Sequence, residues 1–366
     1  MSGTEVAESD PELLGTVLAV QANYYRVQLE LNPELPVAPS TALELLCTRR
    51  ARLKKLGQRV IVGDLVRVEE PDWMGQRGAI AQVLPRQTQL NRPPVANADQ
   101  ILLVFALEEP SLDPYQLSRF LVTAEITDLA VTLCLSKSDL VSIEQQEYWC
   151  DRLRQWGYEP ILISLCRGRG LLELADQLRD QLTVVSGPSG VGKSSLINHL
   201  IPTIDLRIGA VSDRRGQGRH TTRHVELFEL PSGGLLADTP GFSQPALDCA
   251  PESLVNYFPE ARQRLAIASC QYKNCLHCGE PNCVVRGNWE RYPHYLDFLA
   301  EVTAQQSQIN EMSDPESTLK LKTKSKGQHQ YEPKLDTKKY RRPSRRTQQQ
   351  ALKELYKDED LLRENS

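Results

Sequence analysis

A glycine-rich run that ends in Lys193 and Ser194 has the residue types and spacing of a phosphate-binding loop. The letters GPSGVGKS fit the pattern G-x-x-x-x-G-K-S, with an apolar stretch before them and a helical pattern after them. Glycines let the backbone N–H groups point at a β-phosphate, the lysine reaches the β and γ oxygens, and the serine hydroxyl ligates Mg²⁺. We expect this loop to bind a nucleoside triphosphate with Mg²⁺ through Gly187, Pro188, Ser189, Gly190, Val191, Gly192, Lys193, Ser194 and Ser195.

A second group of residues with phosphate chemistry lies further along the chain. Asp238-Thr-Pro-Gly241 fits the pattern D-x-x-G, in which the aspartate holds Mg²⁺ through water and the glycine N–H contacts the γ-phosphate. The polar segment 212–223 precedes it and contains Thr221 and Thr222. One of these two threonines is expected to close on Mg²⁺ when the γ-phosphate is present, and the spacing does not choose between them.

Two strand ends upstream of the phosphate loop carry residues suited to reading a base. Ser136-Lys-Ser-Asp139 follows the apolar run 131–135, and Ser164 follows the run 161–163. An aspartate accepts two hydrogen bonds from guanine, which adenine cannot offer, while the Lys137 stem lies along the base. We therefore expect GTP, bound by Ser136, Lys137, Ser138, Asp139 and Ser164. Since Ser136 stands where an asparagine is usual, we expect the side-chain tie between base and phosphate loop to be missing.

Four cysteines and a histidine between positions 270 and 283 form the third group. In a reducing compartment such crowding indicates a metal rather than disulfides. Three thiolates and one imidazole suit a closed, structural tetrahedral zinc site without an open position for catalysis. Cys278 lies directly beside His277, so the spacing alone does not say which of the two is a ligand.

The elements that must position these groups fall into three kinds. Residues 13–90 predict a small β-barrel with a basic loop over 49–55, because short alternating segments are separated by turn residues. Residues 91–246 predict an α/β domain with a mostly parallel sheet, because apolar strands alternate with amphipathic helices. Helical patterns then surround the cysteines. The polar tail 313–366 predicts disorder with a short terminal helix, and eleven Lys or Arg lie between positions 320 and 346.

Composition limits the class of protein. The 366 residues are 40% hydrophobic and 25% charged, which excludes collagen-like, coiled-coil and wholly disordered chains. The longest apolar run, 101–107, is far shorter than the roughly 20 residues of a membrane helix, so no membrane contact is expected. The acidic N-terminus 1–12, expected to be disordered, lacks the features of a signal peptide, which predicts a cytoplasmic protein.

The motif order is base reader, phosphate loop, switch and D-x-x-G, a circular permutation of the usual GTPase order. With the segment Gly218-Arg-His-Thr-Thr222 and the cysteine cluster, the chain resembles the ribosome small-subunit-dependent GTPase A (RsgA) family. The resemblance implies an all-β oligonucleotide-binding (OB) barrel over 13–90, a permuted P-loop GTPase domain over 91–246 and an α-helical zinc-binding module over 247–312. It also implies one zinc ion, held by Cys270, Cys275, His277 and Cys283.

The same resemblance implies a function. Such a chain would be a monomeric GTPase assembly factor that binds 16S rRNA on the small (30S) ribosomal subunit during its late maturation. It would hydrolyse GTP to GDP when the subunit stimulates it, and then leave. Phe242 stands where GTPases place a water-orienting glutamine, so His220 is the catalytic candidate by resemblance, with RNA contact as its alternative role.

Two other classes of protein remain open from the sequence. One is a P-loop ATPase or kinase with RNA-binding appendages, in which Asp139 would have no role in reading a base. The other is a nucleotide-insensitive RNA-binding protein with a vestigial GTPase fold. The retention of Lys193, Ser194, Asp238 and Gly241 argues against the second class.

Overall fold

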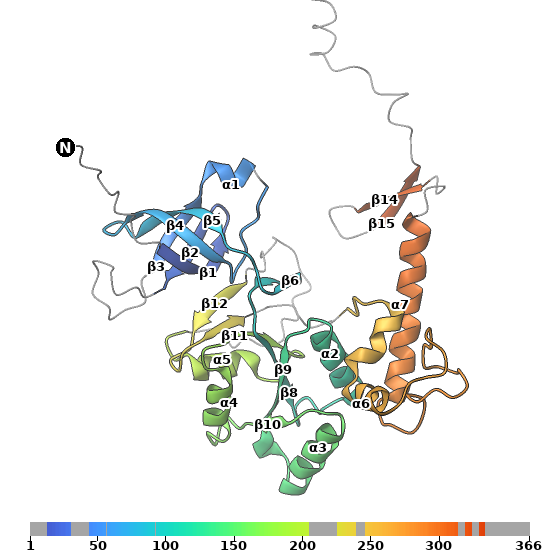
Figure 1. Cartoon of the computed structure of the whole chain (residues 1–366). Helices are drawn as coiled ribbons and strands as arrows, with labels where there is room; N and C mark the ends of the chain where they lie inside the picture. Colours follow the sequence, from blue (N-terminus) through green and yellow to red (C-terminus); the bar gives the residue numbers. More distant parts are fainter. Residues whose placement is uncertain are drawn as a thin grey trace, which may run out of the picture. The chain divides into compact units, whose positions relative to one another are not determined.

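The structure is a computed structural model of the chain. It describes residues 13–30, 44–55, 57–91, 93–204, 225–238, 246–313, 319–323 and 329–333, without the side chains of Lys54, Asp238 and the residues after 310. The chain divides into two compact units, residues 1–302 and 303–366. The first unit carries the predicted barrel, the α/β part and the cysteine cluster, and Figure 1 shows their elements.

The N-terminal strands close into the predicted barrel. Their order is β1-β2-β3-β5-β4, with β4 pairing back to β1, and β3 and β5 run parallel. Alternate side chains point into the barrel and form one apolar cluster, which includes Val17, Val27 and Ile80. A Cβ on Gly15 would lie 2.6 Å from the Gln28 carbonyl oxygen, so only glycine allows β1 and β2 to approach this closely. The strands are β1 (Leu13–Gln21), β2 (Tyr24–Leu29), β3 (Glu44–Arg49), β4 (Leu65–Asp72) and β5 (Arg77–Val83).

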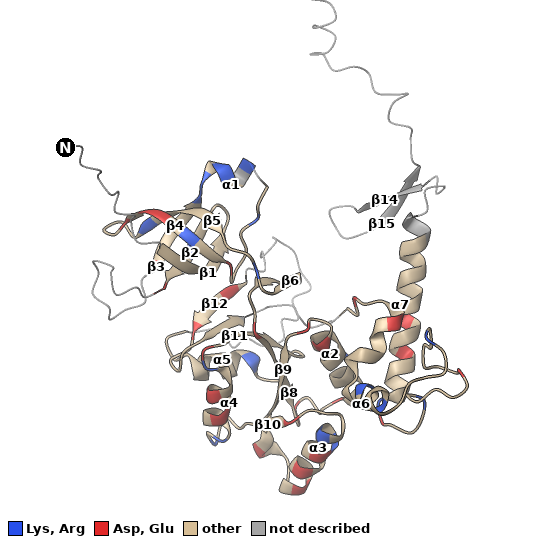
Figure 2. Ribbon diagram, viewed as in Figure 1, with Lys and Arg blue, Asp and Glu red and all other residues tan. Residues whose placement is uncertain are grey.

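One local expectation for the barrel is wrong. Residues 59–62 contain no strand, and only Val62 makes an isolated bridge, to Val95. The basic run after β3 contains the short helix α1 (Ala51–Lys55). Leu53 lies on this helix and packs into the barrel core, which leaves Arg52 and Lys55 exposed. The basic residues of α1 stand out in blue in Figure 2.

A six-stranded sheet forms the centre of the first unit. Its order is β10-β9-β8-β11-β13-β12, and all neighbours are parallel except β12, which runs antiparallel to β13. Every residue of β8 is buried, as expected of a strand covered on both faces. The strands are β8 (Gln100–Ala106), β9 (Ala130–Ser136), β10 (Pro160–Leu162), β11 (Leu182–Ser186), β12 (Glu226–Glu229) and β13 (Leu235–Asp238).

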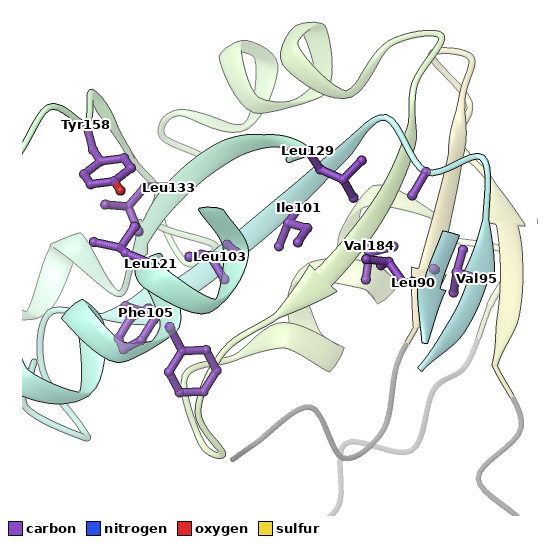
Figure 3. Close-up of a cluster of buried hydrophobic side chains, with 14 of the residues drawn as sticks. Leu90, Val95, Ile101, Leu103, Phe105, Leu121, Leu129, Leu133, Tyr158 and Val184 are labelled. Carbon is purple, nitrogen blue, oxygen red and sulfur yellow. The ribbon is translucent and has the colours of Figure 1, made fainter. Parts of the chain in front are cut away.

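Helices cover both faces of this sheet. Ile101, Leu103 and Phe105 of β8 pack with α2 (Pro114–Glu125) and α3 (Ile143–Gln155), as Figure 3 shows in part. The alternate β8 residues, such as Leu102 and Val104, pack with α4 (Leu171–Leu178) and α5 (Lys193–Leu200). The predicted α/β alternation is therefore confirmed. Because all the parallel strands point the same way, the carboxyl ends of β8, β9, β10, β11 and β13 lie at one edge of the sheet.

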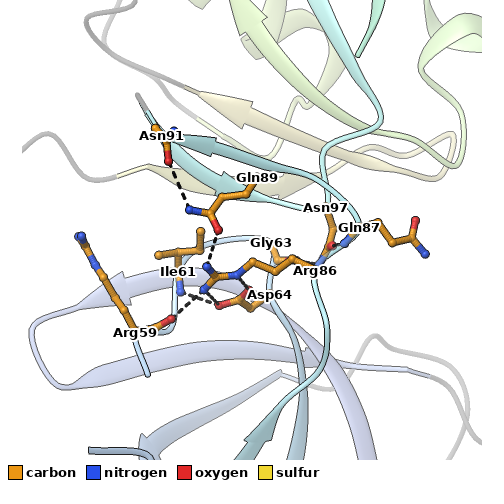
Figure 4. A network of polar contacts seen from close by, with 9 residues as sticks. All are labelled: Arg59, Ile61, Gly63, Asp64, Arg86, Gln87, Gln89, Asn91 and Asn97. Carbon is orange, nitrogen blue, oxygen red and sulfur yellow. Dashed lines mark hydrogen bonds and ion pairs between the residues drawn. The ribbon is translucent and has the colours of Figure 1, made fainter. Parts of the chain in front are cut away.

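A network of polar contacts connects the barrel to the sheet (Figure 4). Asp64 is fully buried, and its carboxylate receives two hydrogen bonds from Arg86, at 2.7 and 3.0 Å. Asn97 donates to the Gly63 carbonyl oxygen at 2.9 Å and accepts from the Gln87 backbone. Between Arg86 and Asn97 lies the hairpin of β6 (Gln89–Asn91) and β7 (Pro94–Ala96). The boundary expected after residue 90 therefore falls inside a paired strand.

The cysteine-containing part of the chain has the predicted helical character. A 3-10 helix, η2 (Pro251–Tyr257), and α6 (Pro259–Ile267) pack with the long helix α7 (Tyr292–Ser313) around a cluster of aromatic residues. Phe258 lies at its centre, in ring contact with Trp289, Tyr295 and Phe298. Among the described helices, none combines the length and the apolar character needed to cross a lipid bilayer.

The tail differs from its expectation of disorder at ten positions. β14 (Leu319–Thr323) and β15 (His329–Pro333) form an antiparallel hairpin in the second unit. The sequence of β14, LKLKT, alternates leucine and lysine, and this period of two favours a strand. The expected disorder rested on the high charge of the tail and not on this alternation. The expected terminal helix lies outside the described residues.

Candidate functional site

The phosphate loop connects β11 to α5 at the carboxyl edge of the sheet. Gly187, Gly190 and Gly192 have φ angles of 143°, 84° and 95°, which glycine adopts without strain. A Cβ on Gly187 would lie 2.1 Å from the Val104 carbonyl oxygen, so the loop can fold tightly over β8 only with glycine there. The tight turn that the sequence pattern predicts is therefore present.

Lys193 begins α5 and turns back into the loop. Its Nζ donates to the Gly187 carbonyl oxygen at 2.8 Å and also to the Pro188 carbonyl oxygen. The ammonium is thereby held across the turn. Since a helix N-terminus also carries partial positive charge, the two together favour an anion at this place. Ser194 and Ser195 follow in the first turn of α5 and are partly exposed.

The base-reading run follows β9 directly. Lys137 adopts a left-handed conformation with φ 55°, and Ser138–Leu140 form the 3-10 helix η1. Ser164 follows β10 and its hydroxyl donates to Asp139 Oδ1 at 2.5 Å. This hydrogen bond, more than any other contact, lowers the pKa of Asp139 below its ordinary value, with a smaller contribution from Arg167. Asp139 is therefore an ionised hydrogen-bond acceptor at neutral pH, as reading guanine requires.

The side-chain amide of the usual asparagine is absent, but a hydroxyl still connects the end of β9 to the phosphate loop. The Ser136 hydroxyl lies 2.6 Å from the Val191 carbonyl oxygen, in the middle of the phosphate loop. Ser136 is only 4% exposed, so solvent does not compete for this bond. Serine is shorter than asparagine, but Ser136 is the last residue of β9 and therefore lies close to the phosphate loop. Only β8 separates β9 from β11, the strand that leads into that loop.

Three residues that no sequence motif indicated support the base-reading run. The Lys137 ammonium donates to the Glu109 carbonyl oxygen, in the loop after β8. Gln146 on α3 donates to the Ser138 carbonyl oxygen at 2.7 Å, and Arg169 donates in turn to the Gln146 side chain at 3.0 Å. The signal for Gln146 was a polar residue on the buried face of an amphipathic helix.

The remaining predicted nucleotide residues are only partly described. Asp238 ends β13, and the parallel pairing of Ala237 with Val184 brings it to the same sheet edge as the phosphate loop. Its side chain lies outside the described part. His220, Thr221, Thr222 and Gly241 lie outside the described residues, as does Phe242.

The four predicted metal ligands converge in space. Their ligand atoms all lie within 4.8 Å of one another. His277 Nδ1 is 3.5 Å from Cys270 Sγ, 3.4 Å from Cys275 Sγ and 3.3 Å from Cys283 Sγ, and Cys270 Sγ is 3.9 Å from Cys283 Sγ. Zn–S and Zn–N bonds of about 2.3 and 2.0 Å in a tetrahedron would give about 3.5 Å for S···N and about 3.8 Å for S···S. The cluster therefore fits a metal of the size of zinc.

The structure also resolves the choice between His277 and Cys278. Cys278 is exposed and stands outside the four-ligand group. The loop is supported from behind by Glu280, whose carboxylate accepts the backbone N–H groups of Leu276, Cys278 and Gly279. These backbone hydrogen bonds lower the pKa of Glu280 to about 2. Tyr292 on α7 adds a bond to the His277 carbonyl oxygen at 2.8 Å.

Comparison with known proteins bears on the same residues. The RsgA GTPase family model matches residues 83–248. A protein named small ribosomal subunit biogenesis GTPase RsgA from Trichormus variabilis is 63% identical, covering 95% of this chain and 98% of its own length. A relative from Arabidopsis thaliana, RsgA 1, mitochondrial, is 42% identical over 96% of this chain and 89% of its own.

Solved structures agree. The crystal structure of YloQ, described as a circularly permuted GTPase, is 30% identical, with a TM-score of 0.66 over 83% of this chain and 99% of its own. YjeQ from Thermotoga maritima is 29% identical, with a TM-score of 0.67 over 80% of this chain and 99% of its own. The order of the motifs, the sheet that carries them and these likenesses agree. The chain belongs to the RsgA GTPase family of circularly permuted GTPases.

Proposed function

We propose that this protein is a GTPase that acts in the biogenesis of the small ribosomal subunit. The observation that carries the proposal is that the phosphate loop and an ionised Asp139 meet at one sheet edge, linked by the Ser136 hydroxyl. A phosphate loop alone suits any nucleoside triphosphate. An oriented carboxylate at its side selects guanine, because guanine donates from N1–H and from its 2-amino group.

The residues divide the work of binding and hydrolysis. Asp139 and Lys137 hold the base, while the phosphate-loop N–H groups and Lys193 hold the phosphates. Ser194 and Asp238 would hold Mg²⁺, which neutralises charge on the transferring phosphoryl group. Thr221 or Thr222 would close on the ion, and His220 would orient the attacking water. The last two assignments rest on the family resemblance.

The other parts of the chain suit docking on a ribosomal particle. We infer that 16S rRNA is the contact, because the barrel carries the basic helix α1 (Figure 2) and the sequence of the tail is rich in lysine and arginine. A structural zinc ion would hold the loop between Cys270 and Cys283 rigid against the same partner. We expect a monomer that works in the cytoplasm. We also expect three domains, over residues 13–90, 91–246 and 247–312.

The test is GTP and ATP hydrolysis by the purified full-length chain. It is measured alone, with small ribosomal subunits and with large subunits. We expect slow GTP turnover that only small subunits accelerate. Turnover that favours ATP, or that is indifferent to subunits, would support the ATPase alternative.

A matched variant shows whether the phosphate loop is needed for GTP hydrolysis. Lys193→Ala removes the ammonium that the loop holds at 2.8 Å from the Gly187 carbonyl oxygen. Subunit-stimulated phosphate release should disappear in this variant. If it persists, a contaminating GTPase or another site is responsible, and the proposal fails.

A further inference from the structure

We propose that Ser136 is a positioning residue that sets the direction of the Gly192 N–H in the phosphate loop. It would do so by holding the Val191 carbonyl oxygen with its hydroxyl. The inference rests on the proposed function and adds to it. In this proposal the last residue of β9 helps to determine how the phosphate loop binds phosphate. Ser136 acts through the loop backbone and not by contact with the nucleotide.

The contact is short and well shielded. Ser136 Oγ lies 2.6 Å from the Val191 carbonyl oxygen and 3.2 Å from the Phe105 carbonyl oxygen. A serine hydroxyl has one hydrogen to donate, and the shorter contact identifies Val191 as its acceptor. Both Ser136 and Val191 are almost fully buried, at 4% and 1% exposed. A buried carbonyl oxygen that loses its donor has no water to replace it.

Peptide geometry carries the effect from the carbonyl to the next N–H. The peptide bond is planar and trans, so the Val191 C=O and the Gly192 N–H point in opposite directions. Because the hydroxyl holds the C=O toward β9, the Gly192 N–H must point away from β9. Gly192 caps α5, and the N–H groups at a helix N-terminus are those that bind phosphate.

The loop needs such an anchor because its backbone is otherwise free to turn here. Gly190 and Gly192 stand on either side of Val191 and both have positive φ angles. Glycine also populates other regions readily, so this peptide could rotate if nothing held it. Lys193 anchors the first part of the loop through Gly187 and Pro188, and Ser136 anchors the second part.

The test compares Ser136→Thr with Ser136→Val in the full-length chain. Threonine and valine have nearly the same shape, and only threonine keeps the hydroxyl. Affinities for GTP, GDP and inosine triphosphate are measured by nucleotide titration. We expect Ser136→Thr to bind all three within about threefold of the parent, and Ser136→Val to bind each about tenfold more weakly, since one buried hydrogen bond is lost.

Inosine triphosphate separates a phosphate effect from an effect on the guanine 2-amino contact, because inosine lacks that group. If Ser136 acts on the phosphate loop, Ser136→Val lowers GTP and inosine triphosphate affinity by the same factor. A loss confined to GTP would overturn the proposal, as would equal binding by Ser136→Thr and Ser136→Val. Ser136→Ala and Ser136→Asn form a second pair at other side-chain sizes, in case valine does not fold.

A control variant removes a buried hydroxyl without removing a hydrogen bond. Ser118 on α2 is fully buried and its Oγ has no partner among the described residues. Ser118→Ala should bind all three nucleotides as the parent does. If the parent itself prefers ATP, the proposed function fails. If the parent binds GTP and the valine variant binds it equally well, only the role of Ser136 fails.

Discussion

Two serine hydroxyls hold groups of the candidate nucleotide site in place by hydrogen bonds. Ser164 donates a hydrogen bond that orients the Asp139 carboxylate and lowers its pKa, while the Ser136 hydroxyl holds the backbone of the phosphate loop. Each hydroxyl fixes a group that would contact a different end of the nucleotide. Preorganised groups of this kind bind more tightly because less freedom is lost on binding.

Asp139→Asn should change which base the protein prefers. The amide would present a donor to the 2-amino group of guanine, whereas xanthine carries an oxygen at that position and would accept from the amide. We expect GTP affinity to fall by at least about a hundredfold, since two charge-assisted hydrogen bonds are lost, and xanthosine triphosphate affinity to rise. Competition between the two nucleotides measures this. An unchanged preference would show that Asp139 does not read the base.

At the scale of elements, helix α3 lies between the base-reading run and the zinc module. Near its start, Gln146 holds the Ser138 carbonyl oxygen. Near its end, Arg152 pairs with Glu290, and the indole N–H of Trp156 donates to the same glutamate at 2.8 Å. One helix therefore contacts both the base-reading run and the helical module that carries the cysteine cluster.

The buried ion pair of Arg291 with Glu260 lies inside the helical module, and Arg291 also packs on Trp156 and Tyr158 of the sheet-bearing part. Arg291 is fully buried among Trp156, Tyr158 and Phe258 and donates to Glu260 at 2.8 Å. Arg291→Met should lower the free energy of unfolding by about 3 to 5 kcal/mol, because it leaves the glutamate buried and unpaired. Urea denaturation measures this.

The matched control for Arg291 removes both charges. Arg291→Met with Glu260→Leu should recover most of the lost stability, since apolar groups can fill the site without a charge to desolvate. A double variant as unstable as the single one would mean that the pair is needed for its geometry. In that case the charge argument would be wrong.

Cys283→Ser should release the metal and weaken the module that it supports. Its thiolate is one of four ligands in a closed set, and a serine hydroxyl binds zinc poorly. We expect less than one zinc per chain by elemental analysis and a lower midpoint of thermal unfolding. Cys278→Ser, which changes an exposed cysteine outside the set, should keep one zinc per chain. The reverse pattern would contradict the assigned ligands.

At the scale of the whole molecule, the barrel is joined to the catalytic sheet by paired backbone and buried charge. Beyond the Asp64–Arg86 pair, Ala19 of β1 bridges to Glu226 of β12. The Arg26 guanidinium also pairs with Glu226 at 2.7 Å. The barrel therefore contacts β12, the strand that follows the predicted switch segment in the sequence.

Arg86→Met should loosen the junction between barrel and sheet. It leaves the Asp64 carboxylate buried without its cation, at a cost of about 3 kcal/mol. We expect faster amide hydrogen exchange at Ile61, whose N–H donates to Asp64 at 2.8 Å, and through β6 and β7. Arg50→Ala, which breaks only exposed pairs with Glu69 and Glu70, should leave this exchange unchanged. Equal exchange in both variants would refute the role of the buried pair.

Features that depend on short-range patterns could be predicted from the sequence alone. The spacing of Gly187, Gly192 and Lys193, the alternation of strands and helices and the crowding of cysteines each express a local requirement of backbone or ligand geometry. These requirements hold wherever the segment lies in space. The class of fold, the phosphate loop and the base-reading run followed from them, whereas the set of metal ligands was implied by the family resemblance.

Contacts between residues that are far apart in the chain became known only from the folded structure. Ser136 and Val191 are fifty-five positions apart, so no local pattern could show that a serine supplies the tie expected from an asparagine. The exclusion of Cys278 from the metal cluster, the buried Arg291 and the Asp64–Arg86 junction have the same origin. Whether a polar group is partnered depends on which elements pack together, and packing is a property of the whole fold.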